Sequence, residues 1–174
     1  MDRIGDDKAA DTGAGEMGIL QRRKIEAEII APIYRTMCDE IGEARAQDIL
    51  DRAIRQAAIE AGQGFAAKTP GGTSLQTFRE LLELWTREDA LRIEVIAETE
   101  AALHFNVQRC RYAESYRAMG LGEIGHLLSC NRDAAFCIGY DPRLKLTRTQ
   151  TIMEGASHCD FRYEFLKEPT TDQS

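Results

Sequence analysis

The sequence has no long apolar run and no cluster of basic residues. A membrane-spanning helix needs about 20 consecutive, mostly apolar residues, and no stretch of this chain approaches that length. The 22 Lys and Arg residues are outnumbered by 29 Asp and Glu residues, so the formal net charge is −7. Phosphate backbones and anionic membrane surfaces attract clustered cations, so we expect neither a nucleic acid nor a membrane as a partner.

An N-terminal targeting signal is also missing. The stretch MDRIGDDKAADTGAGEMG is polar and acidic, and it lacks the basic start and the apolar stretch of a signal peptide. We therefore expect a cytoplasmic protein with reduced cysteines. An odd number of cysteines also disfavours a disulfide framework; the five are Cys38, Cys110, Cys130, Cys137 and Cys159.

Several catalytic and metal-binding signatures do not occur. There is no C-x-x-C pair, so a zinc ribbon or a thioredoxin-like motif is not supported. The sequence also contains no glycine-rich phosphate loop, no G-x-S-x-G elbow and no H-E-x-x-H pattern. The function must therefore be sought in residues that carry no widespread signature.

The composition that is present is typical of one globular domain. Hydrophobic residues make up 43% and charged residues 29% of the 174 residues, which is long enough and apolar enough to bury a core. Residues 1–16 are rich in Gly, Ala and Asp, and they predict a disordered N-terminal tail. We expect a single domain over 17–168 and a frayed tail over 169–174.

The first half of the chain predicts helices. Apolar residues recur at helical spacing over 19–37, where Pro32 should kink or split the helix. A second apolar stripe predicts a helix over 43–61 that Gly62 ends. After the loop KTPGGTS, Ser74 can cap a third helix.

The second half predicts strands and short helices. The stretches 91–98 and 102–110 alternate as the strands of an antiparallel pair, and 143–153 and 159–166 predict two more strands. Short helices are expected over 110–120 and 122–140. We therefore predict an α+β fold, in which N-terminal helices pack on a C-terminal antiparallel sheet and short helices are inserted between the strand pairs.

The stretch SCNRD is the first candidate site. Cys130 and Asp133 lie three residues apart, so they share one face of a helix. A carboxylate such as Asp133 can orient a base or bind a cation, and Arg132 can hold a substrate carboxylate through two parallel hydrogen bonds. The alternative is a buried helix cysteine followed by a solvated helix end that includes Asn131.

The stretch HCD at the start of the last strand is the second candidate. Strands rarely contain Asp, and here Cys159 is followed at once by Asp160. In a regular strand these two side chains point to opposite faces, unless a bulge after Gly155 changes the alternation. The alternative is a core cysteine beside a surface aspartate.

A metal site is a third possibility. Cys110 shares its predicted strand face with His104, Asn106 and Gln108, and this polar face could be solvated or could line a cavity. His126 is more often a satisfied polar residue than a ligand. Three cysteines with Asp and His nearby would suit zinc, although their spacings in the sequence are long.

The second half of the chain resembles the L-2-amino-thiazoline-4-carboxylic acid hydrolase family. The resemblance covers roughly residues 20–167. It rests on a cysteine at a strand end, a C-x-x-D on a helix, an R-T-x-T strand and a terminal C-D-F-R-Y: Cys110; Cys130 and Asp133; Arg148, Thr149 and Thr151; and residues 159–163.

A more distant resemblance links the same half to the four-vinyl-reductase ligand-binding domain and to transport-particle subunits. In some sensor domains of that group, cysteines and a Glu bind zinc. Cys110 and Cys159 match two of those positions, but Gln150 and Met153 stand at the other two, so that zinc site is not intact here. The transport-particle relatives imply a homodimer.

The family resemblance implies hydrolysis of a five-membered cyclic isothiourea that bears a carboxylate. Water adds to the carbon between sulfur and nitrogen, and the C–S bond breaks to give N-carbamoyl-L-cysteine. In this scheme Cys130 or Cys159 is the nucleophile. Asp133 and Asp160 bind the amidinium group or carry protons.

The other predicted roles concern the substrate carboxylate and the metal. Arg132 or Arg148 would hold the carboxylate, and Asn131, Thr149 and His126 are further predicted substrate contacts. In a rival scheme a metal-bound water attacks, and the metal is zinc held by the cysteines at positions 110, 130 and 159.

Two other classes of function are left open by the sequence. The first alternative to a hydrolase is a small-molecule sensor or binding domain without turnover. The second is a structural or assembly subunit.

Overall fold

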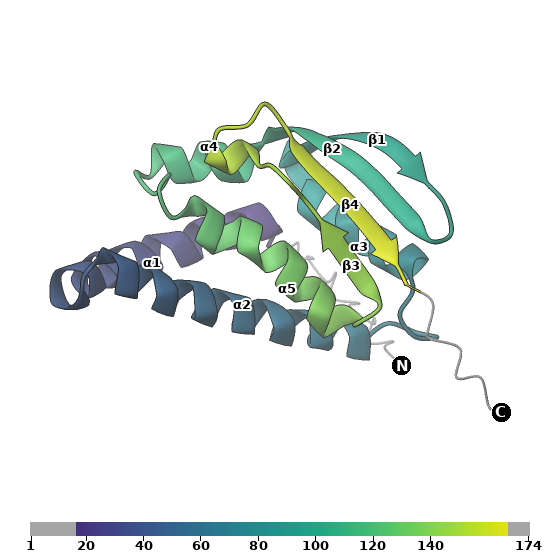
Figure 1. Ribbon diagram of the computed structural model, residues 1–174, viewed down its shortest axis with the longest axis horizontal. Coiled ribbons are helices and arrows are strands. Elements are labelled where there is room, and N and C mark those ends of the chain that lie inside the picture. Colours follow the sequence, from purple (N-terminus) through teal and green to yellow (C-terminus); the bar gives the residue numbers. More distant parts are fainter. Residues whose placement is uncertain (1–16, 167–174) are drawn as a thin grey trace, which may run out of the picture.

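The computed structural model describes residues 17–166 of the chain (Figure 1). The predicted disordered tail at 1–16 and the predicted frayed end at 169–174 lie outside the described residues. Within 17–166, no helix combines the length and the apolar character needed to cross a bilayer.

Within residues 17–166, five α-helices and four strands follow one another in the order that the sequence predicts. Three of the helices precede the sheet, and two short ones lie between the strand pairs. They are α1 (Ile19–Ile41), α2 (Glu43–Ala67), α3 (Leu75–Thr86), α4 (Arg111–Ala118) and α5 (Asn131–Tyr140). Short helical turns occur at Arg87–Asp89, His126–Cys130 and Ile152–Glu154, and the second of these is π-helical.

Four antiparallel strands form one sheet in the order β1-β2-β4-β3. Their bounds are β1 (Leu91–Glu98), β2 (Ala102–Cys110), β3 (Leu144–Thr147) and β4 (Cys159–Phe165). The last strand inserts beside β2, so residues from both halves of the fold meet at the sheet centre. The predicted α+β class, with helices packed on a C-terminal antiparallel sheet, is confirmed.

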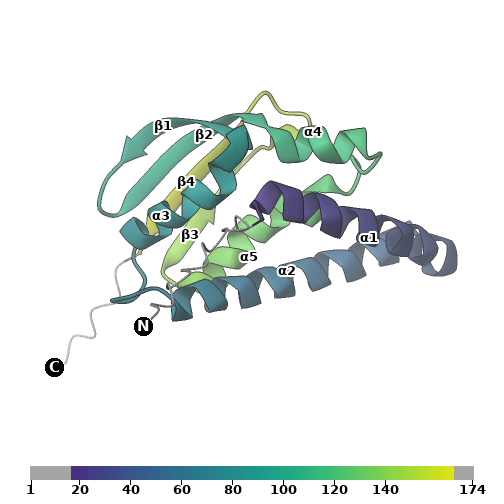
Figure 2. The same ribbon diagram turned by 180° about the vertical axis from the view of Figure 1, so that it is seen from behind.

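The helices cover one face of the sheet, as the two opposite views show (Figures 1 and 2). Phe78 of α3 and Phe136 of α5 pack against Phe105 of β2 and Tyr163 of β4. A second cluster joins α1 and α2 to α4 and the π-helical turn. The space between these two clusters is where the candidate site lies.

Two predicted helix ends are wrong. Helix α1 is not split at Pro32 but continues through this exposed residue to Ile41. Helix α2 continues past Gly62 to Ala67. A glycine is needed at position 62 because α5 crosses α2 there, and a Cβ would overlap the carbonyl oxygen of Phe136. The Ser74 cap is confirmed, since its side-chain oxygen accepts a hydrogen bond from the Thr77 amide at 3.1 Å.

Two details of the predicted strands also differ. β3 ends at Thr147 instead of continuing to Met153, and the chain then turns into a short helical segment. In β2, Arg109 pairs with Arg92 and Val107 pairs with Ile93, so Gln108 is an extra residue that forms a bulge. The bulge reverses the alternation beyond it, and Cys110 therefore does not share the face of His104.

Candidate functional site

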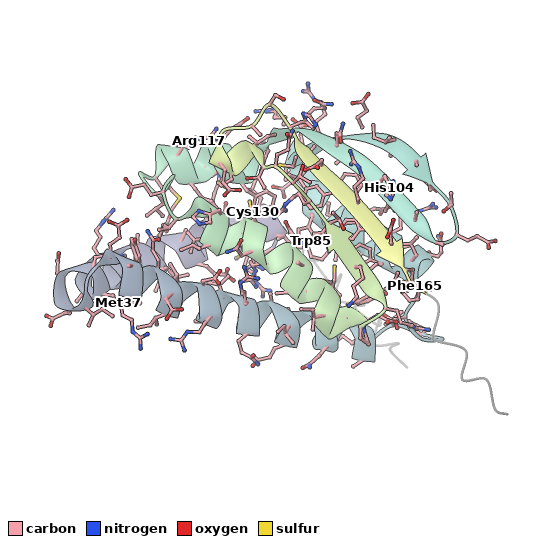
Figure 3. The ribbon with its side chains drawn as sticks, viewed as in Figure 1. Met37, Trp85, His104, Arg117, Cys130 and Phe165 are labelled. Carbon is pink, nitrogen blue, oxygen red and sulfur yellow. The ribbon has the colours of Figure 1, made fainter. Side chains whose placement is uncertain are left out.

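A cavity of about 310 Å³ lies between the inner face of the sheet and helices α1, α2, α3 and α5. Most of its lining is apolar, but a group of cysteine, aspartate, arginine and tyrosine side chains gathers at one end. Figure 3 labels one residue of the polar end, Cys130, and one of the apolar end, Trp85.

Three cysteines reach the polar end from three different elements. Cys110 follows the bulge of β2, and its Sγ caps α4 by accepting a hydrogen bond from the Ala113 amide at 3.4 Å. Cys130 ends the π-helical turn. Cys159 opens β4, and its Sγ accepts from the Ile152 amide at 3.2 Å.

Asp133 and Arg148 form an ion pair beside these thiols. One guanidinium nitrogen of Arg148 donates to Asp133 Oδ2 at 2.5 Å, and another donates to the Cys130 carbonyl at 2.9 Å. The guanidinium also lies 4.9 Å from the centre of the Phe161 ring. Arg148 is thus held on three sides, and it fixes the carboxylate of Asp133 in the cavity wall.

The carboxyl group of Asp133 is suited to taking up a proton. Burial raises its pKa above the ordinary range, although the charge of Arg148 opposes that shift. Its side chain is still 26% exposed and lines the cavity, so a ligand can reach it. A raised carboxyl pKa in a concave site is typical of an acid–base group.

Burial also favours the neutral form of the cysteines, and for a thiol this lowers the reactivity. It raises the pKa of Cys110 to about 11. It also raises the pKa values of Cys130 and Cys159, and the nearby Asp133 carboxylate adds to the effect. A thiolate is the reactive form of cysteine, so at neutral pH these thiols are weak nucleophiles.

Arg132 supplies a cation that has no protein anion bound to it. Among residues 17–166, no side chain forms a hydrogen bond or an ion pair with its guanidinium, which lines the cavity. Burial and the nearby charge of Arg23 lower the pKa of Arg132. Arg23 pairs with Glu26, whereas Arg132 has no carboxylate partner among the described residues, so this corner of the cavity favours an anion.

The structure brings together six of the residues proposed from the sequence. Cys110, Cys130, Arg132, Asp133, Arg148 and Cys159 all line the cavity. Asn131, Thr149, His126 and Asp160 do not line it. Asn131 donates to Asp51 Oδ1 at 2.5 Å, which ties the start of α5 to α2 instead.

Asp160 faces away from the cavity and holds the turn after β3. Its Oδ1 accepts from the Thr149 and Gln150 amides, each at 2.9 Å, and its Oδ2 accepts from the Thr149 hydroxyl at 2.7 Å. Partial burial tends to raise the pKa of Asp160, but these hydrogen bonds outweigh it and lower the pKa. The alternation of β4 is regular, so Cys159 and Asp160 point to opposite faces.

Several residues that line the cavity were not predicted from the sequence. Arg22 and Arg23 reach the cavity from the start of α1, and Tyr112 reaches it from α4. Phe65 and Trp85 form part of the apolar end. The basic stretch QRRK at the first helix was the available signal, but only the packing of α1 against the sheet domain brings it to the site.

The predicted zinc site involves the three cysteines at the polar end. Within residues 17–166, no group of three or more His, Cys, Asp or Glu side chains has the geometry to hold a metal ion. The Sγ atoms of Cys110 and Cys159 accept hydrogen bonds from backbone amides. Zinc therefore stays a prediction, and the reaction proposed below uses side chains and water alone.

Comparisons with known proteins show which fold and which family the chain has. No curated protein matches the chain. Among solved structures, the phenol-responsive sensory domain of the transcription activator PoxR, crystallised with phenol, is 12% identical; the match covers 87% of this chain and 78% of that one, with a TM-score of 0.52.

A trafficking protein particle complex subunit 3 from Naegleria fowleri, covalently bound to palmitic acid, is 11% identical. That match covers 83% of this chain and 99% of the other, with a TM-score of 0.47. The model of the L-2-amino-thiazoline-4-carboxylic acid hydrolase family matches residues 22–163, which include the whole polar end of the cavity. The chain belongs to this family.

Proposed function

We propose that the protein hydrolyses a small cyclic amidine or isothiourea that carries a carboxylate, such as L-2-amino-thiazoline-4-carboxylate, which would give N-carbamoyl-L-cysteine. One observation carries the proposal. Asp133, a carboxyl group whose pKa is raised by burial, and Arg132, a half-buried cation without a partner among residues 17–166, are adjacent in α5 and line the same cavity.

Arg132 would bind the substrate carboxylate. Its guanidinium can donate two parallel hydrogen bonds to a carboxylate, and the charge of Arg23 adds to the attraction. Arg148 is less suited to this role, because its donors are already used by Asp133 and the Cys130 carbonyl. Binding at Arg132 leaves the amidine carbon of a small ring next to Asp133.

Asp133 would act on a water molecule as a general base. It removes a proton from the water while the water oxygen bonds to the ring carbon between sulfur and nitrogen. The resulting tetrahedral species then breaks its C–S bond as its C=O bond forms. The proton on Asp133 moves to the leaving sulfur, and the second proton of the water moves from the new hydroxyl to the amidine nitrogen. One water is consumed, and the ring opens to a urea and a thiol.

Water is the better nucleophile here than the cysteines. Attack by Cys130 or Cys159 requires a thiolate, and burial raises both thiol pKa values. We therefore assign these two side chains to the cavity wall beside the leaving sulfur. If this is correct, iodoacetamide at pH 7 should inactivate the enzyme slowly.

Substitutions can test these roles, because the product thiol is readily measured with a disulfide reagent. We expect Asp133→Asn to lower kcat by at least about 100-fold, whereas Cys130→Ser and Cys159→Ser keep most of it. Arg132→Gln should raise KM about 10- to 100-fold with a smaller change in kcat. Arg52→Gln, on the exposed face of α2, is the matched control.

The pH dependence gives an independent check on Asp133. A general base must be ionised, so kcat should rise with pH through a pKa above the ordinary aspartate value of about 3.9. The direction follows from the burial of this carboxyl group. Full turnover by Asp133→Asn, or loss of turnover in both serine variants, would reject this mechanism in favour of cysteine attack.

A binding domain without turnover is the second candidate. The largely apolar lining of the cavity favours it, and the similar PoxR domain was crystallised with phenol. Isothermal titration and the thiol assay on the same sample separate the two functions. Saturable binding of the thiazoline carboxylate with no thiol release would support the binding domain.

A further inference from the structure

The apolar end of the cavity is larger than the proposed chemistry requires. A single five-membered ring with a carboxylate can be held by Arg132 and Asp133 alone. Yet the cavity continues past them to Phe65, Phe78 and Trp85, and its volume of about 310 Å³ includes this apolar part. Pockets for drug-sized ligands begin at about 300 Å³, so there is room for a larger molecule.

The apolar end is built from aromatic rings. The Trp85 ring meets Phe136 edge-on at a centroid distance of 5.3 Å, and Phe65 meets Phe136 at 5.6 Å. Phe78 and Tyr163 pack at 4.8 Å on the sheet side. These contacts hold the rings in fixed orientations, and such rigid aromatic walls favour a flat apolar group.

Helix α5 connects the two ends. Arg132 and Asp133 occupy its first turn, and Phe136 follows one turn later on the same face as Asp133. All three side chains line the cavity. A molecule with its carboxylate on Arg132 therefore extends along α5 into the aromatic end.

We propose that the natural ligand is a carboxylate that also carries an aromatic or similarly bulky apolar group. This inference rests on the proposed function for its carboxylate and its hydrolysable ring, and it adds the substituent that specifies the substrate. The plain aminothiazoline carboxylate of the family description would then be a minimal substrate that leaves the aromatic end unfilled.

Two matched pairs of probes test the substituent. The first is 2-phenyl- against 2-methyl-thiazoline-4-carboxylate, and the second is 3-phenylpropionate against propionate. In isothermal titration of the whole chain, we expect the phenyl member of at least one pair to bind about tenfold more tightly or better. The methyl ester of the phenylthiazoline should lose that affinity, because it has no charge for Arg132.

A pair of substitutions locates the effect. Ala61 lines the apolar end, so Ala61→Leu should fill it and remove most of the phenyl advantage while leaving the small probes unchanged. Ala57→Leu adds the same atoms on the exposed face of α2 and should change neither affinity. The thermal midpoint of each variant without ligand shows whether it is folded.

The outcomes separate this inference from the proposed function. Equal binding within both probe pairs would overturn the inference, even if the aminothiazoline carboxylate is turned over. Tighter phenyl binding that Ala61→Leu removes would support it, even if no thiol is ever released. A phenyl advantage that survives in Ala61→Leu would place the group elsewhere and would also overturn it.

Discussion

Asp133 and Asp160 show how the surroundings of one residue type decide its role. Both follow a cysteine in a recognisable motif, but Asp133 lines the cavity beside Arg148, and burial raises its pKa. Asp160 accepts three hydrogen bonds from Thr149 and Gln150, and its pKa is lowered. The first carboxyl group suits proton transfer, whereas the second holds a turn.

The role of Asp160 predicts a loss of stability that depends on pH. Its pKa is lower in the folded protein, so its ionised form stabilises the fold above the unfolded pKa of about 3.9, and this contribution is lost as the pH falls through the lower folded value. We expect Asp160→Ala to reduce the free energy of unfolding at pH 7 by about 1–3 kcal/mol. Urea denaturation at pH 7 and at pH 3 measures it.

The difference between wild type and Asp160→Ala should shrink at the lower pH. Asp48→Ala is the control, because Asp48 is half-exposed and pairs only with surface arginines; exposed positions usually change stability by less than about 0.5 kcal/mol. An equal loss at both pH values would show that Asp160 acts through packing and not through its charge.

For single residues, the sequence predicted the site best where the residues concerned are close together in the chain. Cys130 and Asp133 share a helix face, as their separation requires. Asp160 could not be assigned to a turn, because its partners lie in a segment that looked like strand. Arg23 was missed since helix packing, which periodicity does not specify, brings the start of α1 to the cavity.

At the scale of elements, the crossing of α2 and α5 depends on two glycines. A Cβ at Gly62 would lie 2.7 Å from the Tyr140 amide nitrogen, and a Cβ at Gly139 would overlap the Ile59 carbonyl. The two backbones are therefore in direct contact. This contact fixes the second half of α5, the helix whose first turn carries Arg132 and Asp133.

Two alanine substitutions in one helix test that contact. Gly62→Ala should destabilise the protein by about 2 kcal/mol or more, because neither backbone can yield without separating the helices. Gly64→Ala should stabilise it by about 0.5–1 kcal/mol, since a Cβ there meets no other atom and alanine favours helix. Urea unfolding of both variants gives the two values, and equal effects would contradict the close crossing.

The prediction that Gly62 ends α2 is wrong for a physical reason. A glycine after an apolar stripe is a common helix end, and the pattern cannot distinguish it from a glycine that a crossing helix requires. The bulge at Gln108 is similar, because one extra residue in a strand leaves the composition unchanged while it turns Cys110 toward the cavity. Local sequence patterns predicted the helices and strands. Contacts between these elements determine where each one ends and which way its side chains face.

At the scale of the whole molecule, helix α1 leaves an apolar stripe uncovered. Ile25, Ile29 and Ile33 recur every four residues on its outer face and are 37%, 62% and 54% exposed. The same face carries exposed Arg22 at one end and exposed Glu40 at the other. Charges of opposite sign at the two ends make the stripe complementary to a second copy in antiparallel orientation.

The predicted homodimer can be placed on this stripe. If Ile29 of one copy lies opposite Ile33 of the other, Arg22 lies opposite Glu40 at both ends. Ile29→Glu should then shift the dimer to monomer in light scattering after gel filtration, because it buries an unpaired charge. Ile138→Glu alters an isoleucine of similar exposure on α5 and should leave the dimer intact.

A charge reversal tests the orientation of the two copies. Arg22→Glu should weaken the dimer because it places two acids together at each end of the stripe, and Glu40→Arg should weaken it by placing two bases there. The double variant restores opposite charges and should regain most of the affinity, a recovery that parallel packing does not predict. Since Arg22 also lines the cavity, a dimer with this geometry would bring the interface to one wall of the site. A monomeric wild type, or a double variant weaker than both single ones, would show that the stripe is not a self-association surface.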